Sequence, residues 1–373
     1  MMEEKGGECL YPGRVGLQQR VLPSYRVSFF GRLAKACEGG LSVFAGEPRP
    51  QEAILRMDHL EVAHYTPSRN LHILRGSYYV CLQLGLVKWL KDWDPEALIL
   101  EANPRYLVNH FGIAWMHDRD RPVLGWGLGA QPIRGTLAGL RKWARRGFLR
   151  QFDVLLAYSN LGAEQYRAAG VPPERILVAT NAVSPPPPSL PERPPLAERP
   201  PRLLFVGRLQ ARKRVDLLLR ACASLEEQPD LWVVGDGPAR SELESLAREI
   251  YPRASFAGAQ HSHALDWFFA RADLFVLPGT GGLAVQEAMG HGLPVIVAEG
   301  DGTQNDLVAE GNGWLVPPGD VNALSETLRE ALANPIQLRE MGVKSHRLVQ
   351  ERFNIDTMVG VFVRALNLTA EGR

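Results

Sequence analysis

Short apolar runs alternate with stretches of helical periodicity along most of the chain. The runs with the length of a buried strand are Val15–Gln18, Leu41–Ala45, Ala97–Leu100, Val154–Ala157, Leu203–Val206, Leu231–Val234, Ser255–Ala257, Leu274–Leu277 and Val295–Val297. Between two of these runs, Val215, Leu218 and Cys222 recur at the spacing of one helix face. Strands that alternate with helices predict an α/β fold built on parallel sheets.

A proline-rich segment divides the chain. The chain has 373 residues, which is long for one hydrophobic core, so we expect two domains. Nine of the seventeen residues from 185 to 201 are proline, which helices and central strands exclude. Because runs of proline act as semi-rigid spacers, the sequence predicts a linker at 185–201 between domains at 1–184 and 202–351.

The strongest functional pattern follows the predicted strand Leu274–Leu277. Three glycines form a tight turn there: Gly279, Gly281 and Gly282. A helical pattern then runs from Leu283 to Gly290, and the N–H groups at its start, around Gly282 and Leu283, attract anions, above all phosphate. Glu287 lies about one turn further along, where its carboxylate can accept hydrogen bonds from a polyol. A phosphate beside a diol is typical of a bound nucleotide.

Two cations are expected at the same edge of the sheet. Arg208 follows the predicted strand Leu203–Val206, and Lys213 comes just before the next helix. The carboxyl ends of parallel strands meet at one edge, so both side chains are expected near the Gly282 turn. Two cations beside a helix start favour a diphosphate site, and the alternative is a pair of solvated surface cations.

The stretch from 278 to 298 resembles the signature of glycosyltransferase family 4, whose members are retaining enzymes of GT-B fold. The matching positions are Glu287, Ala288, Met289, Gly292, Pro294 and Val295. The GRLxxxK pattern of the family is present from Gly207 to Lys213, and 311–320 resembles the family's last strand and turn. One position departs from the signature, because its first glutamate is Gly279 here.

The resemblance implies two Rossmann-like domains with parallel sheets that face a central cleft. It implies that 202–351 binds a nucleotide-diphosphate sugar, that 1–184 binds the acceptor, and that a helix at about 352–373 crosses back to the first domain. In this family the second glutamate, Glu287, holds the ribose of the donor. The residues placed on the diphosphate or near the base are Arg208, Lys213, Gly282, Leu283, Gly258 and Ala259.

The implied activity is retaining transfer of a sugar to a hydroxyl acceptor in polysaccharide or glycolipid assembly. The nucleotide sugar is a co-substrate, and no other cofactor and no metal is expected. The family's first glutamate touches the donor sugar, so Gly279 leaves two alternatives open: a nucleotide-sugar epimerase of similar architecture, and a non-catalytic protein that binds nucleotide sugars. The pattern identifies no catalytic residue in the first domain.

The first domain offers candidate acceptor contacts. Arg20, Tyr25 and Arg26 occupy the turn after the first strand, where they meet an anionic acceptor or are merely solvated. Glu101 ends the strand Ala97–Leu100, at the edge where open α/β sheets bind ligands. The alternative role of Glu101 is that of a loop acid that caps the helix after Pro104.

Two further motifs in the first domain do not favour a site. The triplet from Asp118 to Asp120 has the DxD form that holds a metal–diphosphate in other glycosyltransferases, but it precedes a strand instead of ending one. The stretch from Gly125 to Ala130 fits a dinucleotide fingerprint, but Trp126 occupies its turn and Pro132 interrupts the helix start. We therefore expect neither a bound metal nor NAD.

Composition excludes some classes of protein. Lys and Arg total 42 against 41 for Asp and Glu, which argues against binding of nucleic acid. The four cysteines include no CxxC pair, which fits a reducing compartment. The first residues of the chain, which include Cys9, do not form the apolar core of a signal peptide. No apolar run in the sequence reaches the length of a membrane span. We expect a cytoplasmic protein.

One segment breaks the even balance of charge. Between 137 and 150 the cations are Arg141, Lys142, Arg145, Arg146 and Arg150, without one acid. Drawn as a helix, the segment has an apolar stripe from Leu137 to Phe148, which we expect to pack on the first domain. The basic face is either solvated or rests on anionic lipid at the inner face of the cell membrane, next to a glycan or lipid-linked acceptor. In neither case does the stripe enter the membrane.

Overall fold

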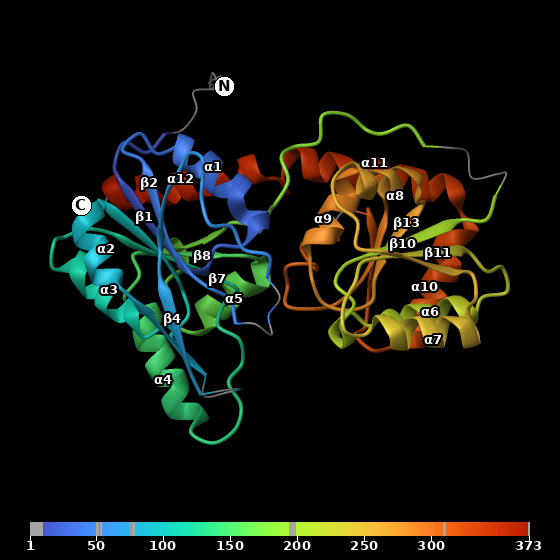
Figure 1. The fold of residues 1–373 in the computed structure, drawn as a ribbon, viewed down its shortest axis with the longest axis horizontal. Coiled ribbons are helices and arrows are strands. Elements are labelled where there is room, and N and C mark those ends of the chain that lie inside the picture. Colours follow the sequence, from blue (N-terminus) through green and yellow to red (C-terminus); the bar gives the residue numbers. More distant parts are fainter. Residues whose placement is uncertain are drawn as a thin grey trace. The chain divides into compact units, whose positions relative to one another are not determined.

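The computed structural model describes residues 10–49, 52, 54–74, 76, 79–193, 199–308 and 311–371. The chain forms two compact units. Unit 1 comprises residues 1–183 and 355–373, and unit 2 comprises residues 184–354. Each unit is built on a parallel sheet with helices on its faces (Figure 1), which confirms the predicted α/β class.

Unit 1 contains a seven-stranded parallel sheet in the order β3-β2-β1-β6-β7-β8-β9. Its strands are β1 (Val15–Val21), β2 (Leu41–Gly46), β3 (His64–Pro67), β6 (Ala97–Glu101), β7 (Val123–Gly127), β8 (Val154–Ala157) and β9 (Ile176–Val178). In β6, Ala97 and Ile99 belong to one buried cluster, and Leu98 and Leu100 belong to another. Because successive side chains of a strand point to opposite faces, this run is apolar throughout and buried on both sides.

Helices cover both faces of this sheet. They are α1 (Val27–Lys35), α2 (Leu86–Trp93), α3 (Val108–His117), α4 (Ala138–Leu149), α5 (Asn160–Ala168) and α12 (Ile355–Glu371). Helix α12, at the end of the chain, lies beside α1 (Figure 1), and the rings of Phe29 and Phe362 pack with centroids 5.0 Å apart. A separate antiparallel hairpin joins β4 (Arg69–Ile73) to β5 (Val80–Leu84).

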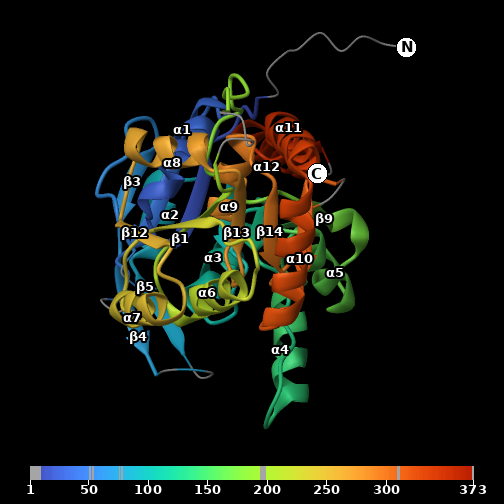
Figure 2. The same ribbon diagram turned by 90° about the vertical axis from the view of Figure 1, so that its right-hand side faces the viewer.

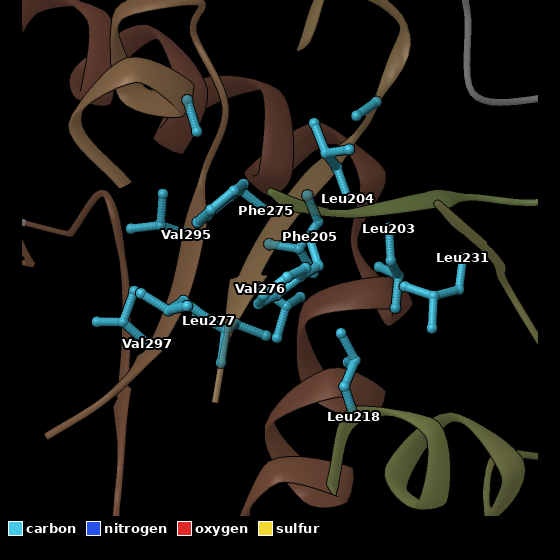
Figure 3. Packing of buried hydrophobic residues seen from close by; sticks show 14 of the residues in the cluster. Leu203, Leu204, Phe205, Leu218, Leu231, Phe275, Val276, Leu277, Val295 and Val297 are labelled. Atoms are coloured by element: carbon cyan, nitrogen blue, oxygen red, sulfur yellow. The ribbon is translucent and has the colours of Figure 1, made fainter. Parts of the chain in front are cut away.

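Unit 2 contains a six-stranded parallel sheet in the order β12-β11-β10-β13-β14-β15. Its strands are β10 (Arg202–Val206), β11 (Asp230–Val234), β12 (Ala254–Gly258), β13 (Leu274–Leu277), β14 (Val295–Ala298) and β15 (Gly313–Val316). Figure 3 shows part of its core, where Leu203 of β10 lies beside Leu231 of β11 and Leu218 approaches from a helix. The helices of unit 2 are α6 (Val215–Ala223), α7 (Arg240–Ile250), α8 (His263–Arg271), α9 (Leu283–Gly290), α10 (Val321–Ala333) and α11 (Pro335–Glu351).

The strand order of each unit contains one topological switch point, where successive strands stop being added on one side of the sheet and begin to be added on the other. In unit 2 the chain runs outward from β10 to β12 and then returns to the other side of β10 to form β13. In unit 1 the same reversal separates β1 from β6. Open α/β sheets bind ligands at the carboxyl ends of the strands beside such a switch point. The topology therefore singles out one edge in each unit.

The proline-rich segment belongs to unit 2 in its described part. Arg193 donates hydrogen bonds to the carbonyl oxygens of Phe269, Ala272 and His291. Arg199 forms an ion pair with the buried Asp273, with 2.6 Å between Nη1 and Oδ2. Residues 194–198 of the predicted linker lie outside the described residues. The described part of this segment is thus anchored to unit 2 by two arginines.

Helix α4 differs from the prediction. Leu137 lies just before the helix, and the fractional exposures of Leu137, Leu140 and Trp143 are 68%, 59% and 73%. The expected packing of an apolar stripe on the first domain is therefore wrong, since only Phe148 of that stripe is buried. The helix is attached to unit 1 through Phe148 and the adjacent Leu149, both at its carboxyl end. No helix among the described residues is long and apolar enough to span a bilayer.

Candidate functional site

The glycine turn of unit 2 has the predicted form. Strand β13 ends at Leu277, and α9 begins at Leu283 and ends at Gly290. No side chain caps the amino end of α9, and the N–H groups of Gly282 and Leu283 have no acceptor among the described residues. A helix start with free N–H groups favours an anion. The turn therefore offers an anion site next to the topological switch point of unit 2.

A buried glutamine that the sequence analysis did not single out holds this turn in place. The Gln304 side chain is fully buried, and its Nε2 donates a 2.9 Å hydrogen bond to the carbonyl oxygen of Gly279. Its Oε1 accepts a 2.8 Å hydrogen bond from the N–H of Gly281. Gln304 lies more than twenty positions after the turn in no recognisable motif, so only the tertiary structure brings it to the site.

Gly279 is the position where the family signature has glutamate, and the structure gives a reason for the difference. A Cβ atom built on Gly279 would lie 2.2 Å from the carbonyl oxygen of Arg212 and 2.6 Å from the Cα of Lys213. The two loops are joined there by a 3.2 Å hydrogen bond from the N–H of Thr280 to the carbonyl of Arg212. Such contacts are far too short for any side chain, so this backbone has no room for a carboxylate at position 279.

Lys213 is a buried cation at the glycine turn. It ends the 3₁₀ turn Ala211–Lys213 after β10, and only 8% of its surface is exposed. Its Nζ lies against Gly281, where a built Cβ would approach to 2.4 Å. Burial, with a smaller effect of the neighbouring Arg212 cation, lowers the pKa of Lys213 to about 8. Among the described residues Lys213 forms no ion pair, so its ammonium group lacks an anion in this structure.

Glu287 presents the opposite charge one turn into α9. Burial, with a smaller effect of the Asp266 carboxylate, raises the pKa of Glu287 to about 7. The side chain of Glu287 accepts no hydrogen bond from the described residues. Asp266 in turn pairs with His291, with 3.4 Å between Oδ1 and Nε2. A half-buried carboxyl group without a donor is suited to accept hydrogen bonds from hydroxyl groups of a ligand.

The other predicted residues of unit 2 lie at the carboxyl ends of neighbouring strands. Arg208 is half-buried two residues after β10, on the same connection as Lys213. Gly258 ends β12, and its carbonyl accepts a 2.7 Å hydrogen bond from the N–H of Gly235. Ala259 follows and is exposed. All these residues share one edge of the sheet, with Gly258 and Ala259 two strands away from β10.

At the corresponding edge of unit 1 the predicted residues Arg20 and Glu101 meet. The N–H of Arg20 donates a 3.2 Å hydrogen bond to Oε1 of Glu101. The guanidinium group of Arg20 forms a 2.8 Å ion pair with Glu52. Burial raises the pKa of Glu101, while the hydrogen bond from Arg20 and the charges of Arg20 and Arg26 oppose that rise. Because Arg20 is paired with Glu52 and mostly buried, the alternative that it is merely solvated is wrong, and its contact with an acceptor stays a prediction.

Arg26 is the buried cation of unit 1. It is 6% exposed, and its Cζ lies 4.2 Å from the centre of the Trp126 ring, a cation–π distance. Its Nη2 donates a 3.4 Å hydrogen bond to the hydroxyl of Tyr158, while its Nη1 is buried without a partner among the described residues. Tyr25 is exposed beside it. Trp126 lies within β7, which explains why no nucleotide-binding turn forms at Gly125.

Comparison with known proteins identifies unit 2. Residues 188–347 match the model of the family described as glycosyl transferases group 1. The matched residues lie within unit 2. A relative, a colanic acid biosynthesis glycosyltransferase of Escherichia coli, is 29% identical over 198 residues, which cover 48% of this chain and 47% of the relative. The chain thus spans about half the length of this relative.

Two longer matches extend into unit 1. A lipopolysaccharide core biosynthesis glycosyltransferase of Rhizobium meliloti is 24% identical over 74% of this chain and 87% of its own length. The solved structure of HepE from Anabaena, in complex with UDP, has 17% identity and a TM-score of 0.72, and the match covers 95% of this chain and 99% of HepE. The structural likeness confirms the predicted GT-B fold of the chain.

Proposed function

We propose that the chain is a family 4 glycosyltransferase that moves a sugar, with retention, from a nucleotide-diphosphate sugar to a hydroxyl acceptor. The observation that carries the proposal is the pair Lys213 and Glu287, two groups at the glycine turn that lack partners among the described residues. A diphosphate would supply the anion for Lys213 and for the N–H groups at Gly282 and Leu283. A ribose would supply the hydroxyl donors for Glu287.

The same groups would act during transfer. When the bond between the sugar carbon and the diphosphate oxygen breaks, negative charge grows on the departing phosphate. We propose that Lys213, Arg208 and the N–H groups of the turn stabilise that charge, which is the largest catalytic effect such a site supplies. The acceptor oxygen bonds to the same face of the sugar, and its proton passes to an oxygen of the departing diphosphate. This route requires no protein nucleophile and no metal or cofactor.

The substrates follow from unit 2 and from the relatives. The HepE structure holds UDP, and the similar proteins are named for colanic acid and lipopolysaccharide core biosynthesis. We propose a glycan or lipid-linked acceptor bound by unit 1, where Arg26 and Glu101 mark the switch point, and assembly of a polysaccharide or glycolipid. The proposed location is the cytoplasm, at the inner face of the cell membrane.

Two measurements test this proposal in sequence. Thermal unfolding in a panel of nucleotide sugars identifies the donor, because a ligand that binds the folded state raises the melting temperature. Product analysis with that donor and candidate acceptors then shows whether nucleotide release depends on an acceptor. Release with a glycosylated acceptor supports the proposal. A changed sugar without an acceptor would instead indicate an epimerase, and tight donor binding without turnover would indicate a binding protein.

A further inference from the structure

Helix α4 presents apolar side chains that unit 1 does not bury. Leu140 and Trp143 are three positions apart, so they lie on one face of the helix, and both are exposed. The helix is attached at its carboxyl end and extends from the body of unit 1 in both views (Figures 1 and 2). An exposed tryptophan and leucines on a projecting helix are unusual for a surface that meets only water.

Leu137, just before α4, adds to this face in a strained conformation. Its φ angle is +59°, in the left-handed region that favours glycine, and its side chain is exposed. Packing inside unit 1 does not account for a leucine here, since the side chain is not buried. A bulky apolar residue at a position suited to glycine therefore gains little from contacts within unit 1.

Cations border the apolar face. Lys142, Arg146 and Arg150 are exposed and follow one another at a spacing of four residues, so they form a row along α4. Arg141 and Arg145 are half-buried on the side toward unit 1. None of the five forms an ion pair among the described residues, and no acid occurs from 134 to 152. The uncompensated charge runs beside the exposed tryptophan.

We propose that α4 is a monotopic anchor that inserts Leu137, Leu140 and Trp143 into the interfacial region of an anionic bilayer. Lys142, Arg146 and Arg150 then contact the lipid headgroups. A helix with an apolar edge and a basic row is the form that lies in the plane of a membrane surface, and tryptophan is favoured at that depth. The inference deepens the proposed function and rests on it for the role of a lipid-linked acceptor.

The charges favour lipid over a second copy of the chain. If two α4 helices packed through their apolar faces, the basic rows of both copies would be brought together, and like charges repel. Anionic headgroups instead attract each cation near the surface. The apolar and basic residues therefore act in the same direction only at an anionic bilayer.

Co-sedimentation of the full chain with vesicles tests the proposal without any need for turnover. The vesicles are phosphatidylcholine alone or phosphatidylcholine mixed with phosphatidylglycerol. We expect binding only to the anionic vesicles, and this binding should decrease as the salt concentration is raised.

Two variants test the apolar and the basic residues of α4 separately. The double variant L140Q/W143Q and the triple variant K142Q/R146Q/R150Q are each expected to weaken vesicle binding about tenfold or more. The matched controls are I336Q, at an exposed leucine-sized residue of unit 2, and R167Q/R329Q/R364Q, three exposed arginines elsewhere; both should bind like the wild type.

Leu137→Gly separates anchoring from folding. Because glycine relieves the left-handed backbone, the melting temperature of the Leu137→Gly variant should equal or exceed that of the wild type, while the affinity of the variant for anionic vesicles falls.

Three outcomes of the vesicle experiments would overturn the proposal: equal binding to both kinds of vesicle, no binding to either, or unchanged binding of the α4 variants. So would a wild-type dimer that L140Q/W143Q converts to a monomer without an effect on vesicles. Loss of vesicle binding with transfer to a soluble acceptor intact would support the anchor, whereas vesicle binding without any transfer would contradict only the proposed function.

Discussion

Both units have charged residues at the carboxyl edge of their sheets, but the two units differ in whether these residues have partners within the chain. In unit 1, Arg20 is neutralised by Glu52, and Glu101 accepts a hydrogen bond from the backbone of Arg20. In unit 2, Lys213 and Glu287 have no such partners among the described residues. Arg20 and Glu101 of unit 1 are thus satisfied within the chain, whereas Lys213 and Glu287 of unit 2 are the groups for which we propose partners from a ligand.

The difference has a physical consequence for each unit. A buried ion pair costs stability when one partner is removed, because the other charge is left uncompensated. A buried charge without a partner already has that cost in the free protein, and a ligand of opposite charge removes it. The pKa of Lys213 is lowered and that of Glu287 is raised because burial disfavours the charged form of both. If the proposed function holds, unit 2 sacrifices some stability for binding, as functional sites commonly do.

The largest effect is expected from Gly279→Ala, which breaks the close approach of the two loops in unit 2. The new methyl group would collide with the backbone of Arg212 and Lys213, so we expect a loss of about 3 kcal/mol of unfolding free energy. Nucleotide binding should be abolished as well. Denaturant unfolding and calorimetric titration measure the two effects. Gly360→Ala in α12 is the control, because no atom lies within 4 Å of its added Cβ; equal stability of the two variants would contradict the prediction.

The next effect compares the two cations directly. Lys213→Met should weaken binding of a nucleoside diphosphate about a hundredfold and raise the stability of the free protein by about 1–2 kcal/mol, because it removes a buried charge. Arg20→Met should lower stability by about 1 kcal/mol, because it removes the ion pair with Glu52, whose carboxylate keeps its hydrogen bonds from Arg49. Melting temperatures without ligand show the sign. Changes of the same sign in both variants would contradict the contrast between the units.

Glu287 should make both the stability of the protein and its nucleotide affinity depend on pH. Its pKa is about 7 in the folded protein against 4.5 as the ordinary value, so the folded state retains a proton that the unfolded state loses between these values. Stability should therefore fall as pH rises from 4.5 to 7, by up to about 3 kcal/mol. Glu287→Gln should remove this fall and match the wild type at low pH but exceed it above pH 7. Nucleotide affinity of the wild type should rise over the same range, because the ionised carboxylate is the better acceptor. A stability difference between the wild type and Glu287→Gln that stays constant from pH 4.5 to 7 would refute the raised pKa of Glu287.

The smallest effect sharpens the assignment within unit 2. Arg208→Gln should weaken binding of a nucleoside diphosphate by about 1–2 kcal/mol and leave binding of the nucleoside unchanged, because we propose that Arg208 contacts the diphosphate. Glu287→Ala should weaken binding of both by about 1–3 kcal/mol. Calorimetric titration with each ligand separates the two roles. Equal losses for nucleoside and diphosphate in the Arg208 variant would place its side chain elsewhere.

Much of unit 2 could be predicted from the sequence, because its signals are local. The strand, glycine turn and helix from Leu274 to Gly290 follow from apolar runs and glycine positions within a short window. Arg208 and Lys213 could be assigned to the same edge because parallel strands align their carboxyl ends. The pairing in unit 1 is harder to predict, since Glu52, the partner of Arg20, lies in a segment without a clear pattern that begins at Pro48.

The sequence by itself determined the α/β class, the parallel sheets and the edge that carries the unit 2 site, because periodicity and glycine position act over a few residues. Only the tertiary structure decided which charges are paired, why position 279 must be glycine, and that Gln304 supports the turn, because these facts depend on loops distant in sequence that approach within a few ångströms. The tertiary structure also decided whether the apolar face of α4 is buried. An apolar stripe predicts a helix face, but whether that face is covered depends on where neighbouring elements lie, and they leave Leu140 and Trp143 exposed.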